Sequence, residues 1–230
     1  MRIIDPYAVI LTPTQVFSNC TYTESVMKIN TCGRLCYRSE AKDYDSVGFI
    51  ERLINNGHES VLEHCSITVI VTCDRAISHQ IVRHRIGSYS QESQNIKYKG
   101  ITYIKPFYMD WNSPEFNNWL AVMGVCEKAY LDLLNFMPAQ RARCVLPNST
   151  ATRIAITYNL REWRHFFKLR CSPAAHPQMR QIAIPLLLKL KFYMPVFFAD
   201  IKYDEDFPVE HYAKVFVGMA NAQECCWWED

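Results

Sequence analysis

The sequence predicts an α+β fold in which helices flank a central antiparallel sheet. Helical and β-branched segments are interleaved irregularly, whereas a parallel βαβ sheet requires a regular alternation. The 230 residues are 49% hydrophobic, which is sufficient for one sizeable core. With 7 glycines and no repeat or low-complexity tract, the sequence marks no linker. We therefore expect a single domain over residues 1–230.

The first half of the chain predicts strands, helices and one loop. The strand segments are short and apolar or β-branched, and they cover residues 2–11, 66–73 and 101–104. Apolar residues at helical spacing predict helices over residues 23–37 and 44–56, and Gly57 stands at the expected stop. Residues 75–85 are also helical in character, and the serine-rich residues 86–100 predict a loop.

The second half predicts three helices and one strand. A long amphipathic helix over residues 115–136 is closed by Pro138. A β-like segment over residues 150–158 leads into a helix over residues 160–170. The last long helix begins near Pro177, because proline suits the first turn of a helix.

Charge and hydropathy exclude several classes of protein. The 25 basic and 23 acidic residues are spread along the chain, whereas a general nucleic-acid binder carries a clustered basic excess. No stretch reaches the ~18 apolar residues of a membrane helix. An acid and a proline stand near the N-terminus, where a signal peptide has its apolar core. We therefore expect a cytoplasmic protein that binds neither nucleic acid nor membrane.

The 10 cysteines predict neither a metal centre nor a disulfide framework. Their spacing is irregular and includes no Cys-x-x-Cys pair. Disulfides are not expected without a secretory signal. Because residues such as Cys73 and Cys126 lie among apolar neighbours, we interpret most of the cysteines as small buried hydrophobic residues.

Four segments gather polar groups that a hydrophobic core would exclude, and one of them contains Arg83-His84-Arg85. If residues 75–85 are helical, Gln80, Arg83 and His84 share one face. Two guanidiniums beside an imidazole suit a phosphate or another anion that accepts bidentate hydrogen bonds. A solvated basic helix end is the structural alternative, because positive charge also suits a helix C-terminus.

Two further segments have structural explanations of their own. Residues 58–64 directly precede a predicted strand, and His58 alone suits a hydrogen-bonded structural role. Residues 141–147 place Arg143 beside an apolar turn, where surface salt bridging is the alternative.

The fourth segment, residues 159–170, combines core and polar features. Asn159 and Glu162 have the spacing of a capping box, which explains both residues structurally. The aromatic residues of the segment are expected in the core: Trp163, Phe166 and Phe167. Arg170 lacks such an explanation, since it lies on the same face as Asn159, about three turns on, among apolar neighbours.

Taken together and in this order, the segments resemble the flavin-dependent thymidylate synthase family. The hallmark of that family is Arg-His-Arg, then seven residues, then serine, which Arg83-His84-Arg85 and Ser93 match. Residues 58–64, 159–170 and 175–180 match further segments of the family. The resemblance spans about residues 25–195 and implies the fold of that family.

The resemblance also implies a set of site residues. Those that would contact FAD are His58, Ser60, Arg83, His84, Arg85, Gln91, Asn159, Arg161 and His165. Those that would hold the nucleotide are Gln80, Arg83, Gln91, Ser93, Asn95, Arg143 and Arg170. Arg170 would be the catalytic group that faces the uracil ring and favours loss of its N3 proton, because a fixed guanidinium stabilises a developing anion. No residue is implied as a metal ligand.

The implied reaction is the reductive methylation of dUMP to dTMP. NADPH would reduce the FAD, and methylenetetrahydrofolate would supply the carbon. No cysteine would need to attack the pyrimidine. The resemblance further implies a homotetramer whose active sites are shared between subunits.

One residue departs from the family pattern. After Ser93 the family continues as x-Arg-Tyr, whereas this chain reads Gln94-Asn95-Ile96-Lys97-Tyr98. Loss of a charge-assisted hydrogen bond to phosphate weakens binding by ~1.5–3 kcal/mol. Lys97 and Lys99 are candidates to compensate.

Two alternative functions stay open at this point. The first is a family member that acts on another pyrimidine nucleotide or transfers a different one-carbon group, which Asn95 favours. The second is a nucleic-acid-binding module that uses Arg83, Arg85 and Arg143, which the net charge of +2 disfavours.

Overall fold

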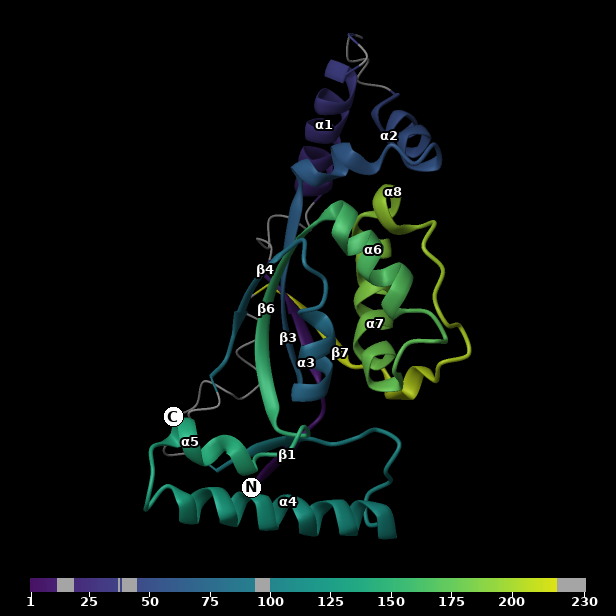
Figure 1. Ribbon diagram of the computed structural model, residues 1–230. Helices are drawn as coiled ribbons and strands as arrows, with labels where there is room; N and C mark the ends of the chain where they lie inside the picture. Colours follow the sequence, from purple (N-terminus) through teal and green to yellow (C-terminus); the bar gives the residue numbers. More distant parts are fainter. Residues whose placement is uncertain (12–18, 37, 39–44, 94–99, 219–230) are drawn as a thin grey trace.

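A sheet of five strands lies at the centre of the fold (Figure 1). The computed structural model describes residues 1–11, 19–36, 38, 45–93 and 100–218. The strands are β1 (Arg2–Ile4), β2 (Tyr7–Ile10), β3 (Ser66–Asp74), β4 (Ser88–Gln91), β5 (Thr102–Ile104), β6 (Ala151–Asn159) and β7 (Lys214–Val217). The order in the central sheet is β4-β6-β3-β2-β7, and β1 pairs with β5 in a separate sheet. Every neighbouring pair of the central sheet is antiparallel except β2 and β7, so the predicted fold class is confirmed.

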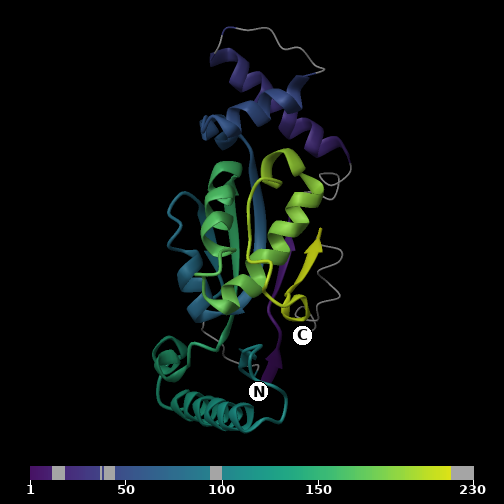
Figure 2. The same ribbon diagram turned by 90° about the vertical axis from the view of Figure 1, so that its right-hand side faces the viewer.

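The helices cover one face of this sheet and both of its ends. They are α1 (Asn19–Cys36), α2 (Ser46–Asn55), α3 (Arg75–Ile81), α4 (Pro114–Leu133), α5 (Ala139–Ala142), α6 (Leu160–Arg170), α7 (Pro177–Tyr193) and α8 (Pro195–Phe198). Short 3-10 helices are η3 (Glu59–His64), η4 (Arg143–Val145) and η5 (Val209–His211). Figures 1 and 2 show α6 and α7 along the sheet, α1 and α2 at one end, and α4 at the other. Among the described residues, no helix is both long enough and apolar enough to cross a bilayer.

The long strands β3 and β6 carry the centre of the core. They pair antiparallel from Ser66 opposite Asn159 to Asp74 opposite Ala151. Alternate β-branched side chains along both strands are buried, as suits a pleated surface with one face in the core: Ile67, Val69, Val71, Ile154 and Ile156. Since β6 ends at Asn159, the chain passes from the sheet centre directly into α6.

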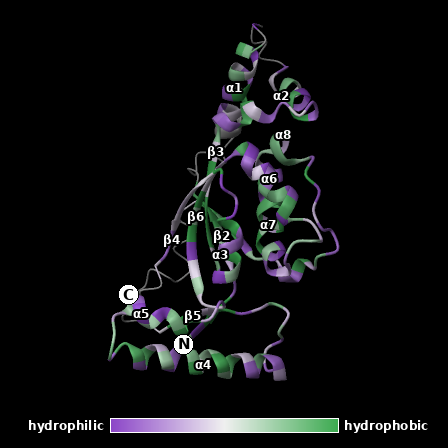
Figure 3. Cartoon of the chain, in the orientation of Figure 1, coloured by the Kyte–Doolittle hydropathy of each residue, from purple (hydrophilic) through white to green (hydrophobic). Residues whose placement is uncertain are grey.

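Helix α6 is anchored to the sheet by its aromatic residues. Trp163 and Phe167 are completely buried, and Phe166 nearly so, which confirms their predicted core role. The Trp163 indole Nε1 donates a hydrogen bond to the Ile67 carbonyl of β3 over 3.0 Å. Hydrophobic residues gather on the central strands and on α7 in Figure 3. This packing fixes the position of α6 relative to β3.

The strand predicted over residues 2–11 is two strands that enter different sheets. β1 pairs with β5, whereas β2 lies between β3 and β7. Asp5-Pro6 separates them, and the missing N–H of proline cannot donate to a ladder there.

Strand β4 lies inside residues 86–100, which the sequence predicted as a loop. It is the edge strand of the sheet and pairs with β6, and only Tyr89 is partly buried. An edge strand held by backbone hydrogen bonds needs no hydrophobic alternation, so the pattern carried no signal of it. The elements after α7 were also not predicted.

The described cysteines occupy every kind of environment. Cys65, Cys73 and Cys171 are buried, as expected. Cys126 is only partly buried, and Cys36 and Cys144 are exposed. Among the seven described cysteines, which include the partly buried Cys32, the interpretation as buried hydrophobic residues is therefore correct for Cys65, Cys73 and Cys171 only.

Candidate functional site

The end of α2 positions His58 and Ser60. Gly57 has φ = 74°, its N–H donates to the Ile54 carbonyl over 3.0 Å, and the His58 N–H donates to the Leu53 carbonyl over 2.8 Å. These two hydrogen bonds form a Schellman motif, which needs the left-handed backbone that glycine adopts without strain. The motif confirms the predicted stop and turns the chain into η3, which carries Ser60.

The segment after α3 holds Arg83, His84 and Arg85 outside any helix. The helix predicted over residues 75–85 ends at Ile81, so the expectation of a shared helical face is wrong. The Tyr158 hydroxyl donates to the Ile81 carbonyl over 3.2 Å, and the Tyr89 hydroxyl donates to the His84 carbonyl. Because tyrosines from β6 and β4 take these carbonyls, the backbone is held in a turn by tertiary contacts.

Gly87 allows this turn to lie close to the sheet. A Cβ atom at Gly87 would stand 2.3 Å from Cδ1 of Tyr158 and 3.0 Å from the Thr157 carbonyl. Any side chain at this position would therefore displace the turn from β6.

At the start of α6, one of the two hydrogen bonds of the predicted capping box is formed. The Asn159 side chain accepts a hydrogen bond from the Glu162 N–H over 2.8 Å. The Glu162 side chain does not complete the capping box. It lies instead with Oε1 3.0 Å from Nδ1 of His84, and it is 7% exposed.

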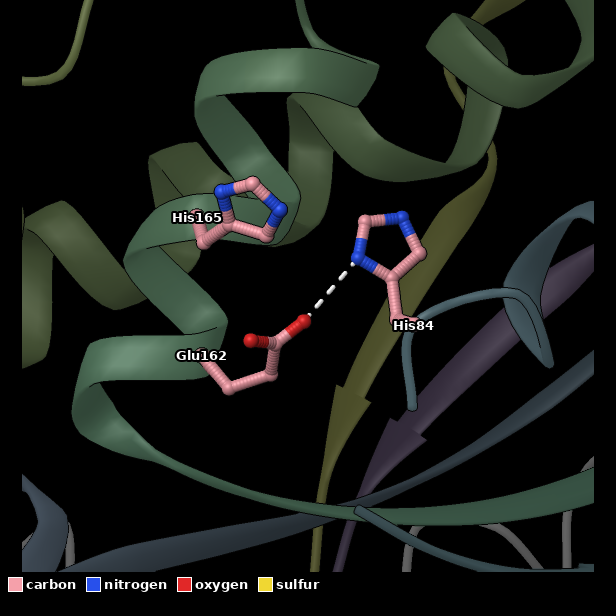
Figure 4. Close-up of side chains that lie close together, drawn as sticks. All are labelled: His84, Glu162 and His165. Carbon is pink, nitrogen blue, oxygen red and sulfur yellow. Dashed lines mark hydrogen bonds and ion pairs between the residues drawn. The ribbon is translucent and has the colours of Figure 1, made fainter. Parts of the chain in front are cut away.

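Figure 4 shows the Glu162 carboxylate turned toward Nδ1 of His84, and Arg170 contacts the other ring nitrogen of His84. The Arg170 Nε donates to Nε2 of His84 over 3.0 Å, and its Nη2 donates to the Gln80 carbonyl over 3.2 Å. A guanidinium is only a donor, so Nε2 of His84 is an acceptor and the ring proton of the neutral imidazole sits on Nδ1. Nδ1–H then donates to the Glu162 carboxylate. The result is a continuous chain from Glu162 through His84 to Arg170.

Burial and the neighbouring positive charges favour a neutral imidazole at His84. Burial, the Arg170 guanidinium and His165 lower the pKa of His84 from 6.5 to about 4. Burial raises the pKa of Glu162, which His165 and Arg161 partly offset. Burial and the nearby Arg83 lower the pKa of Arg170. His84 is therefore uncharged at neutral pH and can accept from Arg170.

A groove of about 420 Å³ opens beside the hydrogen-bonded side chains of Glu162 and His84. It is lined by Glu59, Glu63, Ile86, Asn159, Arg161, Glu162, His165 and Lys168. Arg161 donates to Glu63 over 2.6 Å on its rim. Arg83 and Arg85 are exposed on either side of buried His84, and neither makes a hydrogen bond or ion pair within the described residues. Ile86, which directly follows Arg85 in the sequence, lines the groove, so the segment that borders the groove carries two guanidiniums that are available for an anion.

A buried arginine that the sequence did not single out supports the groove. Arg164 is 1% exposed, and its guanidinium donates to both carboxylate oxygens of Asp200 over 2.7 Å and to Glu59 over 3.1 Å. It thereby joins η3 and α6 to the residues after α8. In the sequence, Arg164 stands between polar and aromatic residues. That pattern did not indicate that its charge would be buried.

Three of the predicted nucleotide residues lie outside the His84 and Arg170 cluster. The Gln91 amide donates to the hydroxyl oxygens of Ser78 and Thr152 over 2.9 and 3.3 Å, which gives it a structural role here. Ser93 follows β4, and Arg143 begins η4 beside α5. Among the described residues, no hydrogen bond or ion pair joins Arg143 to Gln80, His84 or Arg170. Asn95 lies outside the described residues.

The cluster also contains a possible set of metal ligands, which its hydrogen bonds disfavour. Donor atoms of His84, Glu162 and His165 lie within 4.8 Å of one another. However, Nε2 of His84 accepts from Arg170, and Nδ1 carries the proton given to Glu162, so neither nitrogen offers a free lone pair. The neighbouring guanidinium also repels a cation. The arrangement suits a hydrogen-bonded chain better than a metal centre.

Comparison with known proteins finds relatives of this chain. Residues 16–196 match the family described as "Thymidylate synthase complementing protein". The chain is 38% identical over 180 residues to a flavin-dependent thymidylate synthase of Geobacter sulfurreducens, a match that covers 73% of this chain and 78% of the relative. It is 36% identical over 197 residues to the enzyme of the same name from Mycobacterium avium, covering 76% and 78%.

A solved structure with the same fold is that of the UMP/dUMP methylase PolB from Streptomyces cacaoi bound with 5-Br dUMP. The TM-score is 0.71 at 21% sequence identity, and the match covers 86% of this chain and 96% of that chain. At this identity, the likeness concerns the fold.

Proposed function

The chain belongs to the flavin-dependent thymidylate synthase family, and from that premise we propose that it methylates dUMP reductively to dTMP with a bound FAD. It is a flavin-dependent methyltransferase of nucleotide biosynthesis. The geometric observation that supports this proposal best is the placement of Arg170. Its Nε and Nη2 are held by His84 and Gln80, and its Nη1 donates to no acceptor within the described residues, which leaves it for a ligand.

The residues around the groove fit an FAD molecule. Exposed guanidiniums without acid partners suit a pyrophosphate, and Arg83 and Arg85 supply two of them. Asn159, Arg161 and His165 line the groove itself. The bound flavin would supply the hydride that completes the methyl group.

Arg170 suits a role at the pyrimidine ring. A uracil edge that accepts from Nη1 would place the guanidinium beside N3 and its neighbouring carbonyl oxygens. Loss of the N3 proton then leaves a negative charge that the guanidinium stabilises without giving up a proton of its own. The two protein hydrogen bonds of Arg170 keep the guanidinium plane in one orientation, as such stabilisation requires.

We also propose the finer assignments that go with this activity. NADPH would be the reductant, methylenetetrahydrofolate the carbon donor, and the cytoplasm the location of a single-domain chain. Arg143 begins η4 before β6, whereas Arg170 ends α6 after β6, and Figure 1 shows α5 and α6 toward opposite ends of β6; this placement supports a homotetramer in which neighbouring subunits complete one active site. If sites are shared, mixed subunits of Arg143→Ala and Arg170→Lys should regain activity that neither variant has alone. Mixtures that stay as inactive as the separate variants would argue for a site within one chain.

Asn95 supports a second candidate, a family member that acts on a different pyrimidine nucleotide or transfers another one-carbon group. The family pattern has an arginine at this position, and a neutral amide offers the phosphate a weaker contact.

The direct test is a product assay. The purified protein, loaded with FAD, is incubated with dUMP, methylenetetrahydrofolate and NADPH under low oxygen, and dTMP is measured by mass spectrometry. The matched control is Arg170→Lys in the same mixture. A protein that retains no FAD on titration overturns the proposal. Methylation of another nucleotide but not of dUMP favours the second candidate.

A further inference from the structure

We propose that Glu162 is a positioning residue that locks His84 in its Nδ1-protonated form and thereby orients Arg170. The proposal deepens the function proposed above, because Arg170 is the group placed at the uracil ring there. Glu162 itself stays one residue removed from the substrate. It would act by deciding which nitrogen of His84 carries the proton.

The argument begins with the two faces of the imidazole. A neutral imidazole has one donor nitrogen and one acceptor nitrogen, and a buried one exchanges them only if its partners change. Arg170 needs an acceptor at Nε2, and Glu162 provides an acceptor for the proton at Nδ1, with both contacts at 3.0 Å. A carboxylate, which only accepts when ionised, and a guanidinium, which only donates, admit a single arrangement of the ring proton.

Burial prevents water from replacing either hydrogen-bond partner of His84. His84 is 5% exposed and Glu162 is 7% exposed, so water has little access to either partner. The backbone of His84 is held by the Tyr89 hydroxyl, and its ring packs against Phe166 with the ring centroids 5.0 Å apart. The ring therefore cannot turn freely to recover a lost partner.

Removing the acceptor at Nδ1 would reverse the preference. An Nδ1–H without an acceptor would be a buried unsatisfied donor, and because the packed ring cannot turn, the proton would move to Nε2. A proton on Nε2 would face the Nε–H of Arg170, where two donors meet. Arg170 would then keep only the Gln80 carbonyl and lose its defined orientation.

Several charged or titratable groups surround the hydrogen-bonded side chains of Glu162, His84 and Arg170. On α6 these are Arg161, His165 and Arg170 itself, on β6 Tyr158, on β4 Tyr89, and in the turn Arg83. His84 has a pKa of about 4, so the tautomer can be observed near neutral pH without interference from a charged imidazole.

Substitutions at position 162 separate hydrogen bonding from charge. Glu162→Gln keeps an oxygen acceptor for Nδ1–H but removes the negative charge, and it is the matched control. Glu162→Met keeps the length and removes the acceptor, and Glu162→Leu provides a second apolar variant. All three leave the helix cap intact, because Asn159 binds the backbone N–H of residue 162.

The first measurement is the tautomer of His84 in FAD-free protein labelled with ¹⁵N-histidine. The signal is assigned by its absence in His84→Gln. We expect a protonated Nδ1 in the native protein and in Glu162→Gln, and a protonated Nε2 in the two apolar variants. A protonated Nδ1 in an apolar variant that folds overturns the proposal, as does a protonated Nε2 in the native protein.

The second measurement is dUMP affinity by calorimetry with FAD bound. The apolar variants should bind dUMP roughly ten- to hundredfold more weakly, while Glu162→Gln should stay within a few fold of native. In an Arg170→Met background the same changes should have little further effect, because the residue that Glu162 orients is already missing. Equal losses with and without Arg170 would show a merely structural role and overturn the proposal.

The two proposals fail separately. A native protein that makes no dTMP, while the His84 tautomer follows the residue at position 162, contradicts only the proposed function. A native protein that makes dTMP, while the apolar variants keep the native tautomer and affinity, contradicts only the role of Glu162.

Discussion

Arg170 donates a hydrogen bond from Nε to Nε2 of His84 over 3.0 Å, although the two residues lie 86 positions apart in the sequence. A guanidinium that donates to an imidazole requires the imidazole to be neutral. Burial and the positive neighbours lower the pKa of His84 to about 4, which keeps it neutral under ordinary conditions. The histidine of the Arg-His-Arg segment is thus the acceptor that orients the arginine of a distant helix.

Arg170→Lys should retain FAD and lose most of its turnover. A lysine ammonium cannot bind both Nε2 of His84 and the Gln80 carbonyl in one plane and still present an edge to a uracil ring. We expect kcat to fall by roughly a hundredfold, as when a fixed donor to a developing anion is removed. Single-turnover dTMP formation and FAD titration measure the two effects. Near-native turnover would remove Arg170 from the mechanism.

His84 should make the protein less stable in mild acid. Its pKa is about 4 in the folded protein and near 6.5 when exposed, so below pH 6.5 the unfolded chain binds a proton that the folded protein does not. The stability contribution is complete above pH 6.5 and is lost as the pH falls toward 4. Between about pH 7 and pH 5 we expect a loss of roughly 1–2 kcal/mol, allowing for partial solvent screening.

Urea unfolding of the native protein and of His84→Gln at both pH values checks this loss. Every ionisable group other than His84 is present in both proteins, so the difference between the two isolates His84. The prediction is wrong if the two proteins lose the same free energy of unfolding.

Asp200→Asn should destabilise the fold by about 1–3 kcal/mol. The change weakens the bidentate pair with Arg164, whose guanidinium is 1% exposed and would keep Glu59 as its acidic partner. The Arg164 guanidinium lowers the pKa of Asp200, so this contribution is present above the ordinary pKa of an aspartate and is lost as the pH falls below it.

Thermal or urea unfolding at neutral pH measures the effect of Asp200→Asn. The matched control is Glu92→Gln, which disrupts the more exposed pair with Arg153 and should cost less than about 1 kcal/mol. Equal costs for the two variants would show that the burial of Arg164 does not matter.

Asn95→Arg should tighten dUMP binding by roughly tenfold at low salt if this residue lies at the nucleotide phosphate. The gain should shrink as salt rises, because an exposed charge pair is screened. FAD affinity should stay nearly constant. Calorimetric titration at two salt concentrations measures both, and Lys97→Ala and Lys99→Ala show whether a lysine already serves the phosphate. Unchanged or weaker binding in Asn95→Arg, with normal binding in both lysine variants, would place Asn95 away from the phosphate.

The elements whose sequence pattern is local and strong could be predicted from the amino-acid sequence. β3 and β6 followed from β-branched residues, α1 and α2 from apolar spacing, the start of α7 from Pro177, and the stop after α2 from Gly57. The family was also apparent, because Arg83-His84-Arg85 and its companion segments occur in a distinctive order. These features depend on residues near one another in the chain, so a linear reading can find them.

The features that depend on partners far away in the sequence became visible in the folded protein. The end of α3 at Ile81 depends on the Tyr158 and Tyr89 hydroxyls, and β4 is a strand because its backbone pairs with β6. Glu162 has a sufficient local explanation as part of a cap, yet burial turns its carboxylate toward His84, 78 residues away in the sequence. Hydrogen bonding and desolvation act on whatever groups the fold brings together, and no periodicity within one segment records them.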